Sequence, residues 1–251
     1  MEKLILLLLG FVVIDYANGQ CGCPRQSVKL RTRGLDNVKM GDMLLDSTDI
    51  QIINGFKNHY ANSKKWPNNI VTYTFAGNFP QDKIQTVRQS LGELQKDLQN
   101  CVKFQEGRNG HYIEVNSKRE GCYSMLGVTG GPSQPLNLEN PGCMYSKGTI
   151  KHEFIHALGF MHTHMRKDRD NHITIKWDRI LTSQCSQFTK CDGCEPDGPY
   201  ETESVMHYNS EGFACNPSEK VVVKKNGGAI GYNHETTAND LQMIKNFYNC
   251  K

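Results

Sequence analysis

The amino-acid sequence predicts an α+β fold, in which short strands form a sheet and amphipathic helices cover it. Short runs of β-branched and aromatic residues are typical of strands. Two longer stretches place apolar residues every three or four positions, which is typical of helices that pack on a sheet. The 251 residues suffice for one domain of ordinary core size, and their net charge of +3 does not indicate nucleic-acid binding.

The first residues have the features of a secretory signal. A charged start leads into the apolar run LILLLLGFVV, and Ala17 and Gly19 are small residues at the positions that signal peptidase requires. A membrane anchor is the alternative, but Leu4 to Val13 is far shorter than the roughly 20 apolar residues of a membrane span. We therefore expect residues 1–19 to be removed, the protein to be secreted, and no part of it to lie in a membrane.

The next segment, residues 20–56, is polar and lacks a sustained helical or strand period, which indicates a pro-segment and not part of the core. The stretch NNIVTYTFAG then predicts a strand, and DKIQTVRQSLGELQKDLQNC predicts a helix. The apolar stripe of this helix consists of Ile84, Val87, Leu91, Leu94, Leu98 and Cys101. CVKF and YIEV predict further short strands.

A Gly- and Pro-punctuated region spans residues 121–142, and a histidine-rich helix follows, whose apolar face should cover the sheet. The last element is TTANDLQMIKNFY, in which a Thr capping signal precedes Leu241, Ile244 and Phe247 or Tyr248. The chain should therefore close with another amphipathic helix.

The ten cysteines indicate disulfides, because a secreted protein folds in an oxidising compartment. Spacing alone does not give their connectivity. Cys191 and Cys194 in KCDGC resemble half of a zinc knuckle, which Cys185 and Cys215 could complete. Two disulfides among these four cysteines are the favoured interpretation in a secreted chain.

The stretch HEFIHALGFMHTH concentrates histidines in residues 152–164. His152 and His156 are i, i+4 neighbours about 6 Å apart along a helix axis, so they can share one metal ion. A continuous helix would carry His162 about 9 Å beyond His156, too far for a shared ion. Gly159 stands where the helix must stop, because glycine takes the left-handed conformation that turns the chain and brings His162 back.

Three neutral imidazoles leave one position of a tetrahedral zinc ion open for water, whose pKa falls to about 7. Glu153 is better placed as the base that takes a proton from this water than as a ligand, because ligation would close the open position. A chance match at all five positions of H-E-x-x-H-x-x-G-x-x-H has a probability on the order of 10⁻⁴ or less. The sequence therefore predicts a hydrolytic site with one zinc ion per chain.

These residues resemble the metzincins, and more narrowly the astacin family of zinc endopeptidases. The resemblance continues through SVMHY at residues 204–208 and through MRKDRDN, which holds Arg166, Asp168, Arg169 and Asp170. It implies that Met206 lies beneath the metal, and that Tyr208 binds zinc at rest and moves to stabilise the oxyanion when peptide enters. Taken alone, Met206 would be read as core packing and Tyr208 as a buried hydroxyl with a backbone partner.

The resemblance also implies a metzincin-type catalytic domain at residues 57–251, with two lobes and an active-site cleft between them. The N-terminal lobe would hold a mixed twisted sheet and two long helices, including the zinc helix. The C-terminal lobe would be mostly irregular, apart from the closing helix.

Two disulfides follow from the same resemblance. They would join Cys101 to Cys250 and Cys122 to Cys143. Closure of the first loop, which spans nearly the whole domain, would stabilise it by roughly 4–5 kcal/mol before strain. The other six cysteines fall outside this set, and of these Cys21 and Cys23 are assigned to the pro-segment.

The KMGDM stretch resembles the F-x-G-D element of the family's pro-segments, whose aspartate occupies the zinc position that water needs. Asp42 would be that ligand in the zymogen. Lys39 stands where the family has phenylalanine, and a Gly-Asp turn in a disordered tail is the alternative interpretation. An activating protease would cut between Ile53 and Asn58, although no dibasic site stands there.

The resulting expectation is a secreted zinc endopeptidase made as a zymogen, a monomer whose partners are a protein or peptide substrate and an activating protease. The alternative is a catalytically weak secreted zinc-binding or toxin module of the same fold. Glu153 and Tyr208 favour the enzyme, because such a module needs neither a base nor a mobile phenol. The substrate and the biological role are not encoded in any motif of the chain.

Overall fold

The computed structural model describes residues 20–24, 30, 37–55, 64–194 and 198–250. The expected signal at residues 1–19 and the expected first residue of the mature domain, Lys57, lie outside them. No helix in the described part of the chain is long and apolar enough to cross a bilayer.

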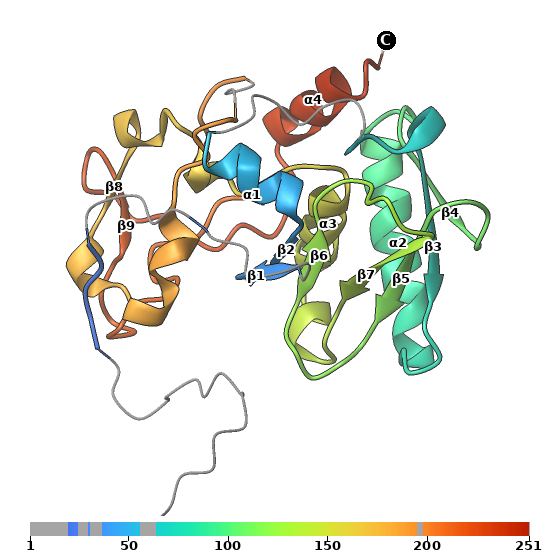
Figure 1. The fold of residues 1–251 in the computed structure, drawn as a ribbon, viewed down its shortest axis with the longest axis horizontal. Helices are drawn as coiled ribbons and strands as arrows, with labels where there is room; N and C mark the ends of the chain where they lie inside the picture. The colour runs from blue at the N-terminus through green and yellow to red at the C-terminus, as the bar shows by residue number, and fades with distance from the viewer. Residues whose placement is uncertain (1–19, 25–29, 31–36, 56–63, 195–197, 251) are drawn as a thin grey trace, which may run out of the picture.

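A seven-stranded mixed sheet forms the N-terminal lobe, with the strand order β1-β2-β6-β7-β5-β3-β4 among the described residues (Figure 1). Its strands are β1 Val38–Met40, β2 Met43–Leu45, β3 Ile70–Phe75, β4 Lys103–Glu106, β5 Tyr112–Asn116, β6 Tyr123–Met125 and β7 Ser133–Asn137. Strand β3 runs parallel to β4 and β5, whereas β6 runs antiparallel to β7. The three predicted strands are thus β3, β4 and β5, while β6 and β7 lie in the region predicted only as turns.

Two helices, α2 Gln81–Asp97 and α3 Lys147–Ala157, share one hydrophobic core with the sheet. The predicted stripe supplies its part of this core, because Val87, Leu91 and Leu94 are at most 1% exposed. The sheet combines parallel and antiparallel pairs and packs against helices, and the α+β prediction is confirmed.

The C-terminal lobe is mostly irregular, as expected. Strand β8 Ile173–Ile175 pairs antiparallel with β9 Val222–Lys224. The closing helix α4, Ala238–Phe247, begins after Thr237, whose side chain accepts a hydrogen bond from the backbone of Asp240 in a capping box. Short 3₁₀ turns occupy Pro67–Asn69, Gly142–Met144, Thr163–Met165, Arg169–Asn171, Trp177–Arg179 and Thr182–Phe188.

The segment before the catalytic domain is folded, and the prediction that residues 20–56 contribute no core is wrong. Strands β1 and β2 and helix α1 Ser47–Ile53 lie between the two lobes in Figure 1, and β2 pairs in parallel with β6. Their buried apolar side chains are Met40, Met43, Leu45, Ile50, Ile52 and Ile53. These residues come from elements of three, three and seven residues, which are too short to show a period in the sequence.

All ten cysteines are in disulfides. Cys101 bonds Cys250 and Cys122 bonds Cys143, the pairs that the family resemblance implied. The expectation of two disulfides within the remaining set of four is wrong, and so is the zinc-knuckle alternative. The pairs are Cys21–Cys215, Cys23–Cys185 and Cys191–Cys194.

A buried charge cluster joins α1 to the catalytic domain. The Lys64 Nζ lies 2.7 Å from Oδ2 of Asp46 and 3.1 Å from Oδ1 of Asp49. Lys64 is 5% exposed and Asp49 is 0% exposed. Burial raises the pKa of Asp49 to about 7 against the effect of Lys64, and the Asp46 carboxylate adds to the rise. One ammonium therefore compensates one of two carboxylates, and the second keeps its proton near neutral pH.

We expect the unprocessed protein to lose stability as the pH rises. The folded-state pKa of Asp49 exceeds its unfolded value. Protonated Asp49 therefore contributes its full stabilisation of the folded protein below the unfolded pKa of about 4, and this stabilisation is lost as the pH rises through about 7. The loss in unfolding free energy should be on the order of 1 to 3 kcal/mol. Asp49→Asn should flatten the pH dependence of the melting temperature between about pH 4 and pH 7. Identical slopes for the variant and the wild type would show that Asp49 is ionised in the folded protein.

Candidate metal centre

Helix α3 and the turn after it bring three histidines together. The ring of His152 lies 4.6 Å from that of His156, the next turn of the helix. The helix ends at Ala157, and Gly159 adopts φ +105°, a conformation that other residues rarely take. The chain then turns back, so that the His162 ring lies 4.7 Å from that of His156. The predicted helix stop at Gly159 is confirmed.

Backbone carbonyls fix the tautomers of the two helical histidines. Nδ1 of His152 lies 2.8 Å from the carbonyl oxygen of Val205, and Nδ1 of His156 lies 2.7 Å from that of Phe160. A carbonyl oxygen only accepts hydrogen bonds, so each Nδ1 carries the proton. In the neutral form of each ring, Nε2 then presents a lone pair to the centre of the cluster, which is the form that binds a metal ion.

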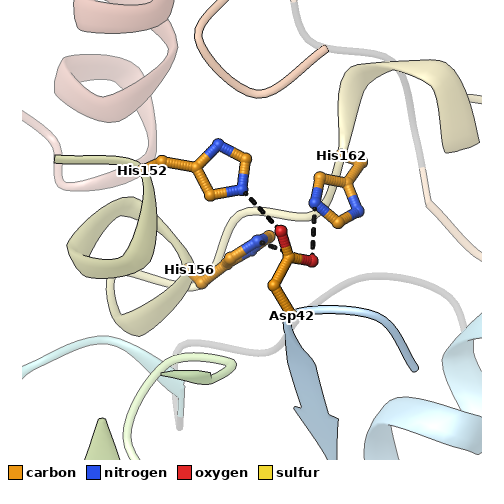
Figure 2. Close-up of side chains that lie close together, drawn as sticks. All are labelled: Asp42, His152, His156 and His162. Atoms are coloured by element: carbon orange, nitrogen blue, oxygen red, sulfur yellow. Dashed lines mark hydrogen bonds and ion pairs between the residues drawn. The ribbon is translucent and has the colours of Figure 1, made fainter. Parts of the chain in front are cut away.

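Asp42 faces the same point from the turn between β1 and β2 (Figure 2). Its Oδ1 lies 3.0 Å from Nε2 of His162 and 3.8 Å from Nε2 of His156. Its Oδ2 lies 3.2 Å from Nε2 of His152. One carboxylate from the β1–β2 turn thus contacts all three imidazoles.

The four side chains fit a metal ion. Their donor atoms all lie within 4.8 Å of one another. Asp42 Oδ1, His156 Nε2 and His162 Nε2 are buried without a hydrogen-bond partner, which is costly unless another group satisfies them. Three imidazole nitrogens with one carboxylate oxygen are a typical ligand set for tetrahedral zinc.

The protonation states of the side chains in the site suit the binding of a metal ion. Burial alone would raise the pKa of Asp42, but the charge of His162 and hydrogen bonds from the imidazoles hold it well below its ordinary value. Burial lowers the pKa of His156, and the neighbouring imidazoles lower it further, so this ring stays neutral. The site therefore offers an ionised carboxylate and an unprotonated nitrogen, the forms that ligate metals.

Glu153 lies in the wall of the site, and it is not among the residues that converge on the ion position. It is 1% exposed, and its Oε2 has no hydrogen-bond partner. Burial raises its pKa well above the ordinary value, and the nearby Asp42 carboxylate raises it further. An unpaired buried carboxyl beside the metal position is available for proton transfer.

The SVMHY turn supports the histidines through its backbone. The carbonyl of Met206 accepts a hydrogen bond from the Thr163 N–H at 2.9 Å, directly after His162. Met206 is 1% exposed and belongs to the main core. Its neighbour Val205 provides the carbonyl that orients His152. The turn therefore fixes two of the three histidines.

Asp240 in α4 holds this turn in place, a role that the sequence did not reveal. Its Oδ1 accepts a 2.5 Å hydrogen bond from the Ser204 hydroxyl, and its Oδ2 accepts from the N–H of Val205. Asp240 is also the third helical residue in the capping box of Thr237. The cap signal in the sequence located the helix start, but the contact with Ser204 depends on tertiary packing.

Tyr208 lies beside the metal position, at the edge of the three-histidine cluster. Its ring stacks on that of His164 at 4.0 Å and lies 4.5 Å from that of His162. Its hydroxyl donates a 3.3 Å hydrogen bond to Oε1 of Gln187, and not to a metal-facing group. Gln187 was not singled out in the sequence, because its side chain reaches Tyr208 across 21 positions.

Asp42, His152, Glu153 and Tyr208 line one cleft of about 660 Å³. Strand β1 and the turn after it line this cleft with Lys39, Gly41 and Asp42. Gly41 has φ +66°, and a Cβ there would lie 2.5 Å from Gln187 Oε1 and 2.8 Å from the Tyr208 hydroxyl. The turn that presents Asp42 thus packs against the groups that hold Tyr208.

Gly41→Ala should weaken the packing of the β1–β2 turn in the cleft. The added methyl would combine a left-handed backbone strain with two close contacts, a loss on the order of 1–3 kcal/mol. We expect a lower melting temperature for the unprocessed protein and faster amide exchange in β1 and β2. Gly77→Ala is the matched control, because a Cβ there meets no atom within 4 Å. Equal effects of the two substitutions would contradict the packing argument.

A mixed sheet beside a helix with H-E-x-x-H, followed by a glycine turn and a third histidine, defines a zinc metallopeptidase. Residues 58–249 match the family model "Astacin", which describes a family of peptidases. The chain belongs to the astacin family.

Relatives and a solved structure agree with this assignment. The chain is 31% identical to zinc metalloproteinase nas-4 of Caenorhabditis elegans, over 86% of this chain and 70% of that protein. It is 30% identical to low choriolytic enzyme of Oryzias latipes, over 88% of this chain and 82% of that protein. The structure of high choriolytic enzyme 1, a hatching enzyme zinc-protease from Oryzias latipes, superposes with a TM-score of 0.71 at 29% identity, and covers 77% of this chain and 98% of that chain. The protein is therefore a zinc-dependent peptide hydrolase.

Proposed function

We propose that the protein is a secreted endopeptidase made as a zymogen, in which Asp42 keeps the metal centre closed until the pro-segment is cut. The observation that carries this proposal is the contact of one pro-segment carboxylate with Nε2 of all three histidines. A substrate carbonyl or an attacking water needs the position that this carboxylate occupies. The same side chain would therefore act as a ligand and as an inhibitor.

His152, His156 and His162 would hold the ion through their Nε2 atoms. When bound, zinc acidifies water and polarises a peptide carbonyl. Glu153 would accept the proton of the attacking water, since its carboxyl is buried beside the site and has an unpaired oxygen. Tyr208 would leave Gln187 and donate a hydrogen bond to the oxyanion of the peptide.

The domain assignment belongs to the same proposal, with a signal at residues 1–19, a pro-segment at 20–56 and a catalytic domain at 57–251. Helix α1 and the β1–β2 turn support a pro-segment that folds onto the domain it inhibits. The disulfides support secretion, because such bonds persist in oxidising compartments. The expected activating cut lies between Ile53 and Asn58, and the expected enzyme is a monomer.

The alternative, a zinc-binding module with little catalysis, makes no use of two features of the cleft. Glu153 is buried with an unpaired oxygen, and Tyr208 is held at the edge of the metal site. Both features would be needed by a hydrolase, and they favour the enzyme.

Zinc removal tests the proposal directly. The protein cut both after Ile53 and between Cys23 and Val38, and freed of the segment between the cuts, should contain about one zinc per chain and cleave internal bonds of unstructured peptides. Dialysis against a chelator should abolish cleavage, and stoichiometric zinc should restore it. Metal analysis beside a mass-spectrometric peptide assay measures both properties. Zinc-loaded protein that cleaves no member of a diverse peptide library would contradict the endopeptidase assignment.

A further inference from the structure

The start of the described chain is fastened to the C-terminal lobe. Cys21 bonds Cys215 and Cys23 bonds Cys185, across separations of 194 and 162 residues. Between them, the Gly22 N–H donates to the carbonyl of Ile180 at 2.9 Å. These contacts make residues 20–24 a part of the lobe that carries the SVMHY turn.

The other end of the pro-segment is docked without covalent bonds. The N–H groups of Asp192 and Gly193, in the loop closed by Cys191–Cys194, donate to the carbonyls of Ile53 and Ile52 at 3.0 Å each. The isoleucine side chains of α1 share a buried cluster with residues of both lobes, Leu126 and Met165 among them. A cut after Ile53 breaks none of these contacts.

We propose that a single activating cut between Ile53 and Asn58 leaves the pro-segment attached, as a second chain joined through Cys21–Cys215 and Cys23–Cys185. This inference rests on the proposed zymogen function. The cut product would be a two-chain molecule, in which Asp42 can return to the metal centre without leaving the enzyme.

Covalent attachment changes how the inhibition responds to concentration. A free pro-segment leaves the cleft when the mixture is diluted, because rebinding is bimolecular. An attached one rebinds at an effective concentration that short linkers set near the millimolar range, whatever the dilution. Release would need reduction or a second cut between Cys23 and Val38. The sequence there contains Arg25, Lys29, Arg31 and Arg33.

The attachment can be measured by mass. A recognition site for a specific protease is placed at residues 54–57 of the full chain, and the cut product is blocked with N-ethylmaleimide and denatured. We expect one species with the summed mass of both chains, which reduction separates into two. A second version carries an added site at residues 25–29, and it should release residues 30–54 without reductant. A pro-segment that separates from the singly cut protein without reductant would overturn the inference.

The consequence for activity is measured with the same two proteins, both of which keep all native disulfides. Specific activity of the singly cut protein should not change over an about 100-fold dilution. That of the doubly cut protein should rise on dilution to a plateau. Equal activation of both proteins by dilution would overturn the inference that the attached segment still inhibits the singly cut protein. If the doubly cut protein never cleaves peptide although the singly cut one stays joined, the peptidase proposal fails and the attachment stands.

Discussion

Replacing Glu153 by glutamine should lower peptidase kcat/KM by about 10²- to 10⁴-fold and leave zinc binding intact. Glutamine has nearly the same size, so the wall of the cleft keeps its shape around a side chain that is 1% exposed. The amide, however, cannot accept a proton from water. The three histidines are untouched, and their tautomers still depend on the carbonyls of Val205 and Phe160.

The experiment compares zinc content and single-peptide turnover for the wild type, Glu153→Gln and Glu114→Gln, each cut at residues 25–29 and 54–57 and freed of the segment between the cuts. Glu114 lies in β5 and makes the matched control, because it undergoes the same chemical change and does not line the cleft. We expect stoichiometric zinc in all three proteins and normal turnover in the control. A Glu153→Gln protein that turns over peptide at nearly the normal rate would exclude Glu153 as the base.

The metal centre could be predicted because its information is local. His152 and His156 lie one turn apart in α3, where helix geometry fixes which side chains meet, and Gly159 follows the end of the helix by two residues. Gly159 has a positive φ, a conformation that glycine adopts readily, so a glycine at this position of the sequence predicts the turn. The strand β3 and the helix α2 were also predictable, since each is long enough to show its hydrophobic pattern.

Other contacts, for which the family resemblance gave no guide, were not predictable, because they join residues that are far apart in the sequence. Lys64 meets Asp49 only after α1 docks, and nothing marks either residue as buried beforehand. Cys21 and Cys215 are separated by 194 positions, and ten cysteines allow many pairings. The prediction that residues 20–56 contribute no core failed for a related reason, since β2 is stabilised by the neighbouring strand β6 and not by its own three residues.

Asp42→Ala in the unprocessed chain should raise peptidase activity without any cut. Alanine cannot ligate zinc, so the position that the Asp42 carboxylate occupies beside the three histidines becomes open. The loss of one charged contact of a carboxylate corresponds to about 1.5–3 kcal/mol, and hence to a gain of about 10- to 100-fold over the wild-type precursor. The gain should stay below full activity, because α1 and β2 still dock and Gly41 still lies against Tyr208.

Asp46→Ala separates ligation from docking. It removes a carboxylate from the same pro-segment, together with the cap of α1 and a 2.7 Å ion pair to Lys64, and it leaves Asp42 in place. The precursors are assayed on one peptide, with intact mass confirming that no cut has occurred. A visible spectrum of the cobalt-substituted proteins reports whether a ligand has changed. We expect Asp42→Ala alone to alter the spectrum and to release the larger activity. If Asp46→Ala activates the precursor and Asp42→Ala does not, latency depends on the docked helix that covers the cleft, and the carboxylate at the three histidines is not the inhibitor.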